Sequence, residues 1–365
     1  MIPTNLISAT VIADSLTEFG FRMLTFKCVL PRIILAELNT HKMLNRSLAS
    51  SRAIRFSKAV QGVEQNPFLP LRWMEDHPGM QGTSFVEDAD EIHDLEQEWL
   101  FTRDLMIKQA TKFNEAKITK QLCNRLIEPF QYVTALVTGT EWENFLALRA
   151  HPMAEIHIAD LAEKILKAAN ASTPISLVAG QWHLPMSEDI DESVLHSIAP
   201  GFYSERALMD DHDWFMEVLP EMQRKVCAGR LARISYQTLD ETPVKSHLED
   251  ILLADRLIQS GHWSPMEHIG MAMGRLELKA HGRIEGYMES SLIPEEIESG
   301  LQVVISNHAD PEIGRPEAIL SYGWSGNLRG FIQYRKTFAG ENRCEPRLEK
   351  KSWQNPTLSS VISAE

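Results

Sequence analysis

The sequence of 365 residues has few cysteines, no long apolar run and no excess of positive charge. Its cysteines lie far apart and form no C-x-x-C pair, which argues against a zinc site and against a disulfide framework. We therefore expect buried free thiols at Cys28, Cys123, Cys227 and Cys344. No apolar run approaches the roughly 20 residues that a membrane helix needs, and the N-terminus lacks a basic-then-apolar signal pattern. These absences predict a cytoplasmic protein with no membrane partner.

The charge balance is acidic. Lysine and arginine number 36 against 50 aspartates and glutamates, so the formal net charge is −14. Broad nucleic-acid binding requires a basic face, and this composition argues against it. An anionic small molecule would instead require a local cluster of cations and other donors within an otherwise acidic chain. The chain is long enough to bury a sizeable core.

Residues 31–52, PRIILAELNTHKMLNRSLASSR, contain such a cluster. Pro31 suits the first turn of a helix, because its fixed φ fits that position and its missing N–H has no partner there. Residues 39–52 are rich in hydroxyl, amide and cationic side chains. Glu37 is the only acid in the whole segment 31–52. This composition predicts an anion site, although a solvated loop has a similar composition.

Two further segments carry polar groups beside a regular element. Residues 261–268, GHWSPMEH, follow the amphipathic pattern HLEDILLADRLIQSG and lead into a strand. Glu267 is able to accept a hydrogen bond from a heterocycle N–H, and Ser264, which precedes a proline, offers a hydroxyl. Helix capping would explain both residues equally well. In residues 124–149, Arg125 lies four positions before a proline and the segment ends in F-x-x-L-R at Arg149.

Together these segments resemble the flavin-dependent thymidylate synthase family, whose signature is roughly R-H-R-x-x-S-x-N-x-x-S-x-R. The matching positions are His41, Ser50 and Arg52. Thr40 and Lys42 stand where the family has two arginines, and Asn45 and Ser47 stand where it has serine and asparagine. The family also has a block similar to GHWSPMEH, preceded by a segment like residues 232–236, ARISY.

The order of these blocks differs from that of the family, in which the ARISY and GHWSPMEH-like blocks come first. A circular permutation accounts for the difference. The resemblance implies an α+β fold, with a twisted sheet covered by long helices. We expect residues 1–186 to carry the R-H-R-like motif and the substrate arginines. Residues 187–365 carry the other two blocks, and both halves belong to one structural unit.

Hydrophobic periodicity predicts the main elements of that fold. One sheet is expected to contain strands near Met23–Leu30, Tyr132–Val137 and Ile269–Leu276. The longest helix is expected at Asp88–Ala116. Residues 53–84 are interpreted as an irregular excursion, residues 187–202 as a connector and residues 280–317 as an insertion.

By resemblance, the chain would bind FAD, take hydride from NADPH and transfer the one-carbon unit of methylenetetrahydrofolate to C5 of dUMP. The substrate-binding residues implied are Glu37, Ser50, Arg52, Arg125 and Arg149. The flavin-binding residues implied are His41, Lys42, Asn45, Asn144, Ser235, Ser264 and Glu267. Arg149, His262 and Ser50 would act in catalysis, with no metal and no cysteine nucleophile. Guanidinium groups suit the nucleotide because they form bidentate bonds to phosphate.

Two other functions stay open. A related flavin enzyme would hydroxymethylate its substrate or act on a cytosine nucleotide. A nucleotide-binding protein without catalysis would explain why Thr40 and Lys42 replace arginines. The resemblance also implies a homo-oligomer, specifically a tetramer, in which each pocket is lined by more than one subunit.

Glu37 separates these possibilities, because better-known members of the family carry a glutamine there. A carboxylate only accepts hydrogen bonds, and it would repel a uracil carbonyl. Glu37 is therefore protonated by burial, paired with Lys42 or Arg46, or bound to the exocyclic amine of a cytosine base. We expect the pairing, because the cations lie within the same short segment.

Overall fold

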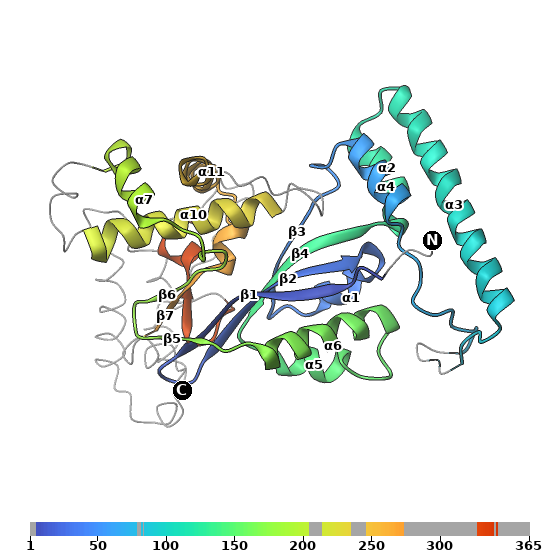
Figure 1. Ribbon diagram of the computed structural model, residues 1–365, viewed down its shortest axis with the longest axis horizontal. Helices are drawn as coiled ribbons and strands as arrows, with labels where there is room; N and C mark the ends of the chain where they lie inside the picture. The colour runs from blue at the N-terminus through green and yellow to red at the C-terminus, as the bar shows by residue number, and fades with distance from the viewer. Residues whose placement is uncertain are drawn as a thin grey trace, which may run out of the picture.

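The computed structural model describes residues 5–78, 82, 84–203, 214–234, 246–273, 327–338 and 341. Within these ranges the chain forms a five-stranded sheet and a smaller three-stranded sheet, with helices packed around both (Figure 1). Among the described residues, no helix is both long and apolar enough to cross a membrane.

The larger sheet has the strand order β3-β4-β2-β1-β5. Its strands are β1 Ser8–Thr17, β2 Arg22–Pro31, β3 Asn45–Leu48, β4 Tyr132–Gly139 and β5 Ile175–Leu177. Neighbouring strands are antiparallel except β1 and β5, which are parallel. A tight turn joins β1 to β2, and Gly20 occupies its left-handed position at φ +80°. The predictions of strands near Met23–Leu30 and Tyr132–Val137 are confirmed.

The smaller sheet has the order β6-β7-β8. Its strands are β6 Trp182–His183, β7 Gly270–Ala272 and β8 Phe331–Gln333. The prediction that Ile269–Leu276 joins the same sheet as the other two strands is wrong. A strand is found there, but its partners are two short segments from distant parts of the chain. Residues 274–276 of the expected strand lie outside the described part, as do residues 280–317 and Cys344. Cys28, Cys123 and Cys227 are buried free thiols, as expected.

Helices cover the sheets and extend away from them. They are α1 Leu35–Thr40, α2 Phe56–Gln65, α3 Ala89–Glu115, α4 Lys120–Leu126, α5 Glu143–Arg149, α6 Ile156–Ala171, α7 Glu192–Ile198, α10 Leu219–Ile234 and α11 His247–Gln259. The short 3-10 helix η5, Ser264–His268, precedes β7. Helix α6 packs on β1 and β2, and α10 packs on β4 and on η5.

Helix α3 confirms the predicted long helix, and Asp88 caps it by accepting from the backbone N–H groups of Asp90 and Glu91. It does not cover the sheet as expected. Only Ala110 of its 27 residues is buried, and it packs on α2 and α4 at the far side of the molecule (Figure 1). Its inward apolar residues, among them Trp99 and Ala110, pack with residues of α2 and α4 instead of the sheet.

Two segments expected to be irregular contain helices. Helix α2 lies within residues 53–84, where Ala59 and Val63, one turn apart, give it a buried side. Helix α7 lies within residues 187–202, and Asp191 caps its start by accepting from the Ser193 backbone N–H. Both helices are short, and the prolines and glycines near them obscured their hydrophobic periodicity in the sequence.

Helices α10 and α11 pack closely at Gly229. A Cβ atom there would lie 2.3 Å from the carbonyl oxygen of Asp250, which is backbone and has no room to move. Gly62 in α2 is exposed and has nothing within 4 Å of such an atom. The same substitution is therefore expected to have opposite effects at the two sites.

We predict that Gly229→Ala lowers the free energy of unfolding by about 1–3 kcal/mol through overpacking. Gly62→Ala raises it by about 0.5–1 kcal/mol, because alanine loses less conformational entropy in a helix. Urea unfolding followed by circular dichroism measures both variants. Equal effects of the two substitutions would contradict the close approach of α10 and α11.

Candidate functional site

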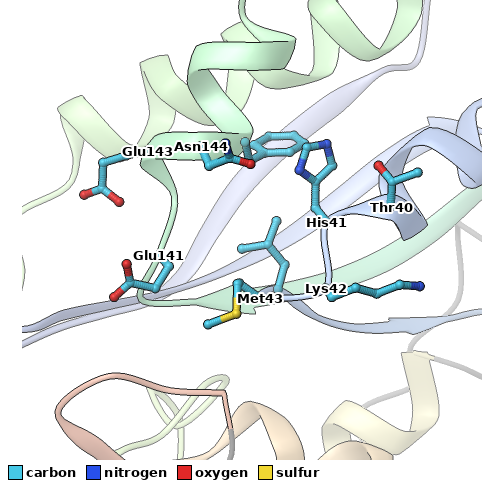
Figure 2. A pocket seen from close by; sticks show the side chains of 9 residues that line it. Thr40, His41, Lys42, Met43, Glu141, Glu143 and Asn144 are labelled. Atoms are coloured by element: carbon cyan, nitrogen blue, oxygen red, sulfur yellow. The ribbon is translucent and has the colours of Figure 1, made fainter. Parts of the chain in front are cut away.

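A pocket of about 390 Å³ opens between two segments that the sequence analysis singled out (Figure 2). Residues 40–44, at and just after the end of α1, form one wall, and Glu141, Glu143, Asn144 and Phe145 around the start of α5 form the other. The pocket thus contains His41, Lys42 and Asn144, three of the residues expected to hold flavin. Its volume is at the lower end of the roughly 300–1,000 Å³ range typical of small-molecule sites.

His41 is held in one tautomer by Arg149. The Arg149 Nε–H donates to His41 Nε2 at 2.9 Å, and its Nη2 donates to the Thr40 hydroxyl at 3.3 Å. Since Nε2 accepts, the imidazole is neutral and carries its proton on Nδ1. Burial lowers the pKa of His41 below its ordinary value, and the charges of Arg149 and Arg46 lower it further. His41 therefore offers the pocket a neutral N–H donor.

The two ends of the pocket differ in charge. In Figure 2 the carboxylates of Glu141 and Glu143 lie at one end, and Thr40 and Lys42 lie at the other. Arg329 lies 3.7 Å from Glu141 and offsets part of the negative charge. A ligand with an anionic group at one end and hydroxyl or N–H donors at the other end fits this arrangement.

The first and second motif blocks are in direct contact. The Asn45 side chain donates to the backbone carbonyl of Glu267 at 3.0 Å, and the hydroxyls of Ser47 and Ser264 are bonded to each other. His268 joins them through Nε2, 2.8 Å from the Ser47 hydroxyl. Residues more than 200 positions apart in sequence thus form one cluster. The cluster adjoins the pocket, because Leu44 lines the pocket and Asn45 follows it.

Capping does not explain Ser264 or Glu267. The N-cap residue of η5 is Trp263, which makes no side-chain cap bond, and the hydroxyl of Ser264 is bonded to Ser47 instead. The carboxylate of Glu267 pairs with Arg335, which also pairs with Glu341. Both residues thus join separate segments of the chain.

The other substrate residues lie around α4. Asn124 on this helix donates to the carbonyls of Ser51 at 2.8 Å and Ile54 at 3.0 Å, and so fixes the loop after β3 against the helix. Ser50 and Arg52 in that loop are exposed, as is Arg125. The Ser50 hydroxyl accepts from the Arg52 backbone N–H at 3.2 Å. The loop and the helix therefore present two cations to solvent.

Within one chain, the expected substrate residues fall into two groups. Arg125 precedes the eight-residue strand β4, and Arg149 follows it on α5. A strand of that length extends about 24 Å, so the two arginines lie toward opposite ends of it. Arg149 is bonded to His41 at one end, while Ser50, Arg52 and Arg125 lie at the other.

Glu37 does not form the expected ion pair with Lys42 or Arg46. One of its carboxylate oxygens is buried without a hydrogen-bond partner. Arg46 instead donates through Nη1 to the carbonyls of Leu38, at 3.0 Å, and His41. The reason is local: the carbonyls of Leu38 and His41 each accept one backbone N–H and keep a second acceptor position, which the guanidinium fills.

Two expected residues lie elsewhere. His262 is exposed, and its Nδ1 is 2.9 Å from the Ser260 hydroxyl. Ser235 lies outside the described residues, directly after the end of α10.

Sequence reasoning missed Glu141, Glu143 and Arg335. The two glutamates are usual at the start of a helix, where carboxylates are favoured, so nothing in the sequence marked them as pocket residues. Arg335 belongs to a short stretch, QYRK, that resembles the first motif only faintly. Its pairing with Glu267 depends on a contact between η5 and η6, Tyr334–Thr337.

No family model matches the chain, and no curated protein matches it. Among solved structures, the chain is similar to the UMP/dUMP methylase PolB from Streptomyces cacaoi, bound with 5-Br UMP. The identity is 14%, the TM-score is 0.38, and the match covers 44% of this chain and 88% of that one. It is also similar to Thymidylate Synthase X from Helicobacter pylori with FAD and dUMP, at 19% identity and a TM-score of 0.28. That match covers 40% of this chain and 67% of that one. Scores this low assign no function.

We predict that Arg149→Met raises the pKa of His41 toward its ordinary value of 6.5, because a nearby positive charge is removed. In the wild type, His41 titrates below 6.5. NMR titration of the imidazole carbon resonances measures both midpoints. Arg103→Met, on α3 and paired with Asp104, is the control and leaves the midpoint unchanged. A His41 midpoint that is the same in all three proteins would contradict the role of Arg149.

Proposed function

We propose that this protein is a flavin-dependent enzyme that modifies a pyrimidine nucleotide at C5, in the manner of the flavin-dependent thymidylate synthases. In this reaction FAD and NADPH supply reduction, methylenetetrahydrofolate supplies the carbon, and dUMP is the acceptor. The observation that carries the proposal is the contact between the first and second motif blocks, Asn45 to Glu267 and Ser47 to Ser264. Two motifs matched independently in the sequence form a single cluster beside a pocket.

The pocket fits part of a flavin nucleotide. His41 would donate from Nδ1, Asn144 would donate or accept through its amide, and Lys42 would attract a phosphate. The carboxylates of Glu141 and Glu143 would accept from ribityl or ribose hydroxyls. The volume holds one ring system with its neighbouring groups and is too small for a whole dinucleotide. When bound, flavin supplies the hydride chemistry.

The exposed arginines beside α4 would bind the nucleotide. Arg52 and Arg125 form no ion pair with another described residue, so both guanidinium groups are available to a phosphate. Asn124 orders the loop before a ligand arrives, and this lowers the entropy cost of binding. Ser50, in the same loop, offers a hydroxyl to the nucleotide.

Incubation of the protein with FAD, NADPH, ¹³C-labelled methylenetetrahydrofolate and each pyrimidine nucleotide tests the reaction. We expect a labelled methyl product from dUMP by mass spectrometry. Arg52→Ala and Arg125→Ala weaken dUMP binding by about 1.5–3 kcal/mol, the usual contribution of a bond to a charged group, and leave FAD binding intact. Ser264→Ala and Glu267→Ala have the opposite selectivity. Arg55→Ala, an exposed arginine next to the motif, is the control for both ligands.

The same experiment separates the alternatives. A hydroxymethyl product, or a preference for dCMP that Glu37→Gln reverses, would establish the related pyrimidine-modifying enzyme. Binding of dUMP without a flavin spectrum and without product would establish the non-catalytic protein. If all four variants bind FAD and dUMP normally, the residue roles are wrong.

A homo-oligomer is part of the proposal. Arg125 and Arg149 lie toward opposite ends of β4 within a chain, so a second copy would supply one of them where both contact one nucleotide. Helix α3 also exposes apolar side chains in a polar helix: Phe101 is 58% exposed, Leu105 40% and Phe113 48%. Phe101 and Leu105 are one turn apart and therefore lie on the same side of the helix. A partner chain would cover this side.

We predict a tetramer at micromolar concentration by light scattering, and a smaller species for the double variant Phe101→Glu/Leu105→Glu with unchanged circular dichroism. The added charges would make burial of this side unfavourable. Leu252→Glu on α11, where the leucine is 47% exposed, is the matched control and keeps the wild-type mass. A monomeric wild type would contradict the proposed assembly.

A further inference from the structure

Seven side chains form one continuous hydrogen-bonded relay between the two sheets. In order they are Ser15, His183, Thr25, Thr138, His268, Ser47 and Ser264. The first five bonds measure 2.8–2.9 Å, and the last, between the two serine hydroxyls, is shorter. The relay ends in the motif cluster of the candidate site.

The fold accounts for this arrangement. The four hydroxyls Ser47, Thr138, Thr25 and Ser15 come from β3, β4, β2 and β1, which are adjacent strands in that order. Thr25 and Thr138 are directly paired across β2 and β4. The two histidines belong to the second layer, His183 to β6 and His268 to η5. Each histidine therefore bridges hydroxyl groups of the larger sheet.

Both histidines are neutral in the folded protein. Burial lowers the pKa of His183 and of His268 to about 3. A neutral imidazole has one N–H donor and one nitrogen acceptor, so each histidine donates one relay bond and accepts the other. Each interior hydroxyl also has two relay partners. Its oxygen must accept at least one of these bonds, because it has a single proton to donate.

Counting protons then fixes the direction of the relay. Seven members carry one transferable proton each, and the relay contains six bonds, so one proton is left over. The histidines are excluded as its owner, because each must donate. Ser15, Thr25, Thr138 and Ser47 are buried, where a proton without an acceptor is costly. Ser264 is exposed, and solvent or a ligand is able to accept its proton.

Every bond therefore points toward Ser264. The Ser15 hydroxyl donates to His183 Nδ1, His183 Nε2–H donates to Thr25, and the sequence continues to Ser47, which donates to Ser264. At His183 the effect of burial is partly opposed by the carboxylate of Asp14, which raises the pKa. Its charge is offset by Arg22, which donates to both carboxylate oxygens at 2.9 and 2.7 Å.

We propose that this relay fixes the Ser264 hydroxyl as an outward hydrogen-bond donor, with His268 and His183 as positioning residues. The ligand atom at Ser264 is then an acceptor, a carbonyl oxygen or an unprotonated ring nitrogen of a heterocycle. The identity of that heterocycle rests on the proposed function, in which oxidised flavin or the pyrimidine base supplies it. The direction of the relay does not depend on that function.

The tautomers of the two histidines test the direction without any ligand. Long-range ¹H–¹⁵N NMR of protein labelled with ¹⁵N-histidine reports which ring nitrogen carries the proton. Single variants His183→Gln and His268→Gln assign the signals. We expect the Nε2–H tautomer for both His183 and His268, neutral down to pH 4. Two Nδ1–H tautomers, or one of each kind, would overturn the proposal.

Ligand binding tests the role of Ser264, with FAD and dUMP as the probes. Ser264→Ala is expected to weaken one of them about fivefold to tenfold, the loss typical of one hydrogen bond, while Ser264→Thr retains the hydroxyl and the affinity. Thr111→Val on α3 is the matched control, because that hydroxyl bonds only to its own helix. Unchanged affinity of Ser264→Ala for both probes would overturn the donor role. If the wild type binds neither probe, the proposed function fails, and the tautomers still decide the direction of the relay.

Discussion

Strand β4 is buried on both faces, and the position of the candidate site follows from this constraint. Its residues alternate between two cores. Val133, Ala135 and Val137 pack with the core that includes α6, whereas Leu136 packs with the core of α10 and α11. Thr138 lies on the same face as Leu136 and has no access to water, so its hydroxyl requires partners inside the protein. Thr25 and His268 provide them, and this requirement brings the GHWSPMEH block against the first motif.

Much of the fold was predictable, and the exceptions share one physical cause. Strands β2 and β4 and helix α3 are long, and their hydrophobic or capping patterns are visible locally. Strands β6, β7 and β8 have two or three residues each, too few to show a period. Their pairing depends on contacts between distant segments, which a single sequence does not reveal. Placing β7 in the larger sheet was wrong for this reason.

The sequence likewise identified some residues of the candidate site and missed others. The motif residues His41, Asn45, Ser264 and Glu267 were identified from the sequence. No role was assigned to Arg335, which pairs with Glu267, or to His268, although His268 belongs to the GHWSPMEH block itself. Arg335 comes from a distant element and carries no spacing signal. Proximity in sequence favoured a pairing of Glu37 with Arg46, but the fold places the Arg46 guanidinium on the carbonyls of Leu38 and His41, at and just after the end of α1. Backbone groups at helix ends compete for cations as effectively as side chains do.

Some lysine and arginine side chains near the site are bound to other groups of the protein, and others are available to an anionic ligand. Arg46 is engaged by backbone carbonyls, Arg149 by His41, and Arg335 by Glu267 and Glu341. Lys42, Arg52 and Arg125 are exposed and form no ion pair with another described residue. The net charge of −14 repels an extended polyanion from most of the surface, because such a ligand contacts many acidic groups at once. A small anion contacts only its own cations, and at short range their attraction outweighs a field that salt screens over about 10 Å. The few free cations beside the motifs in an otherwise acidic chain therefore support the proposed binding of a compact phosphate.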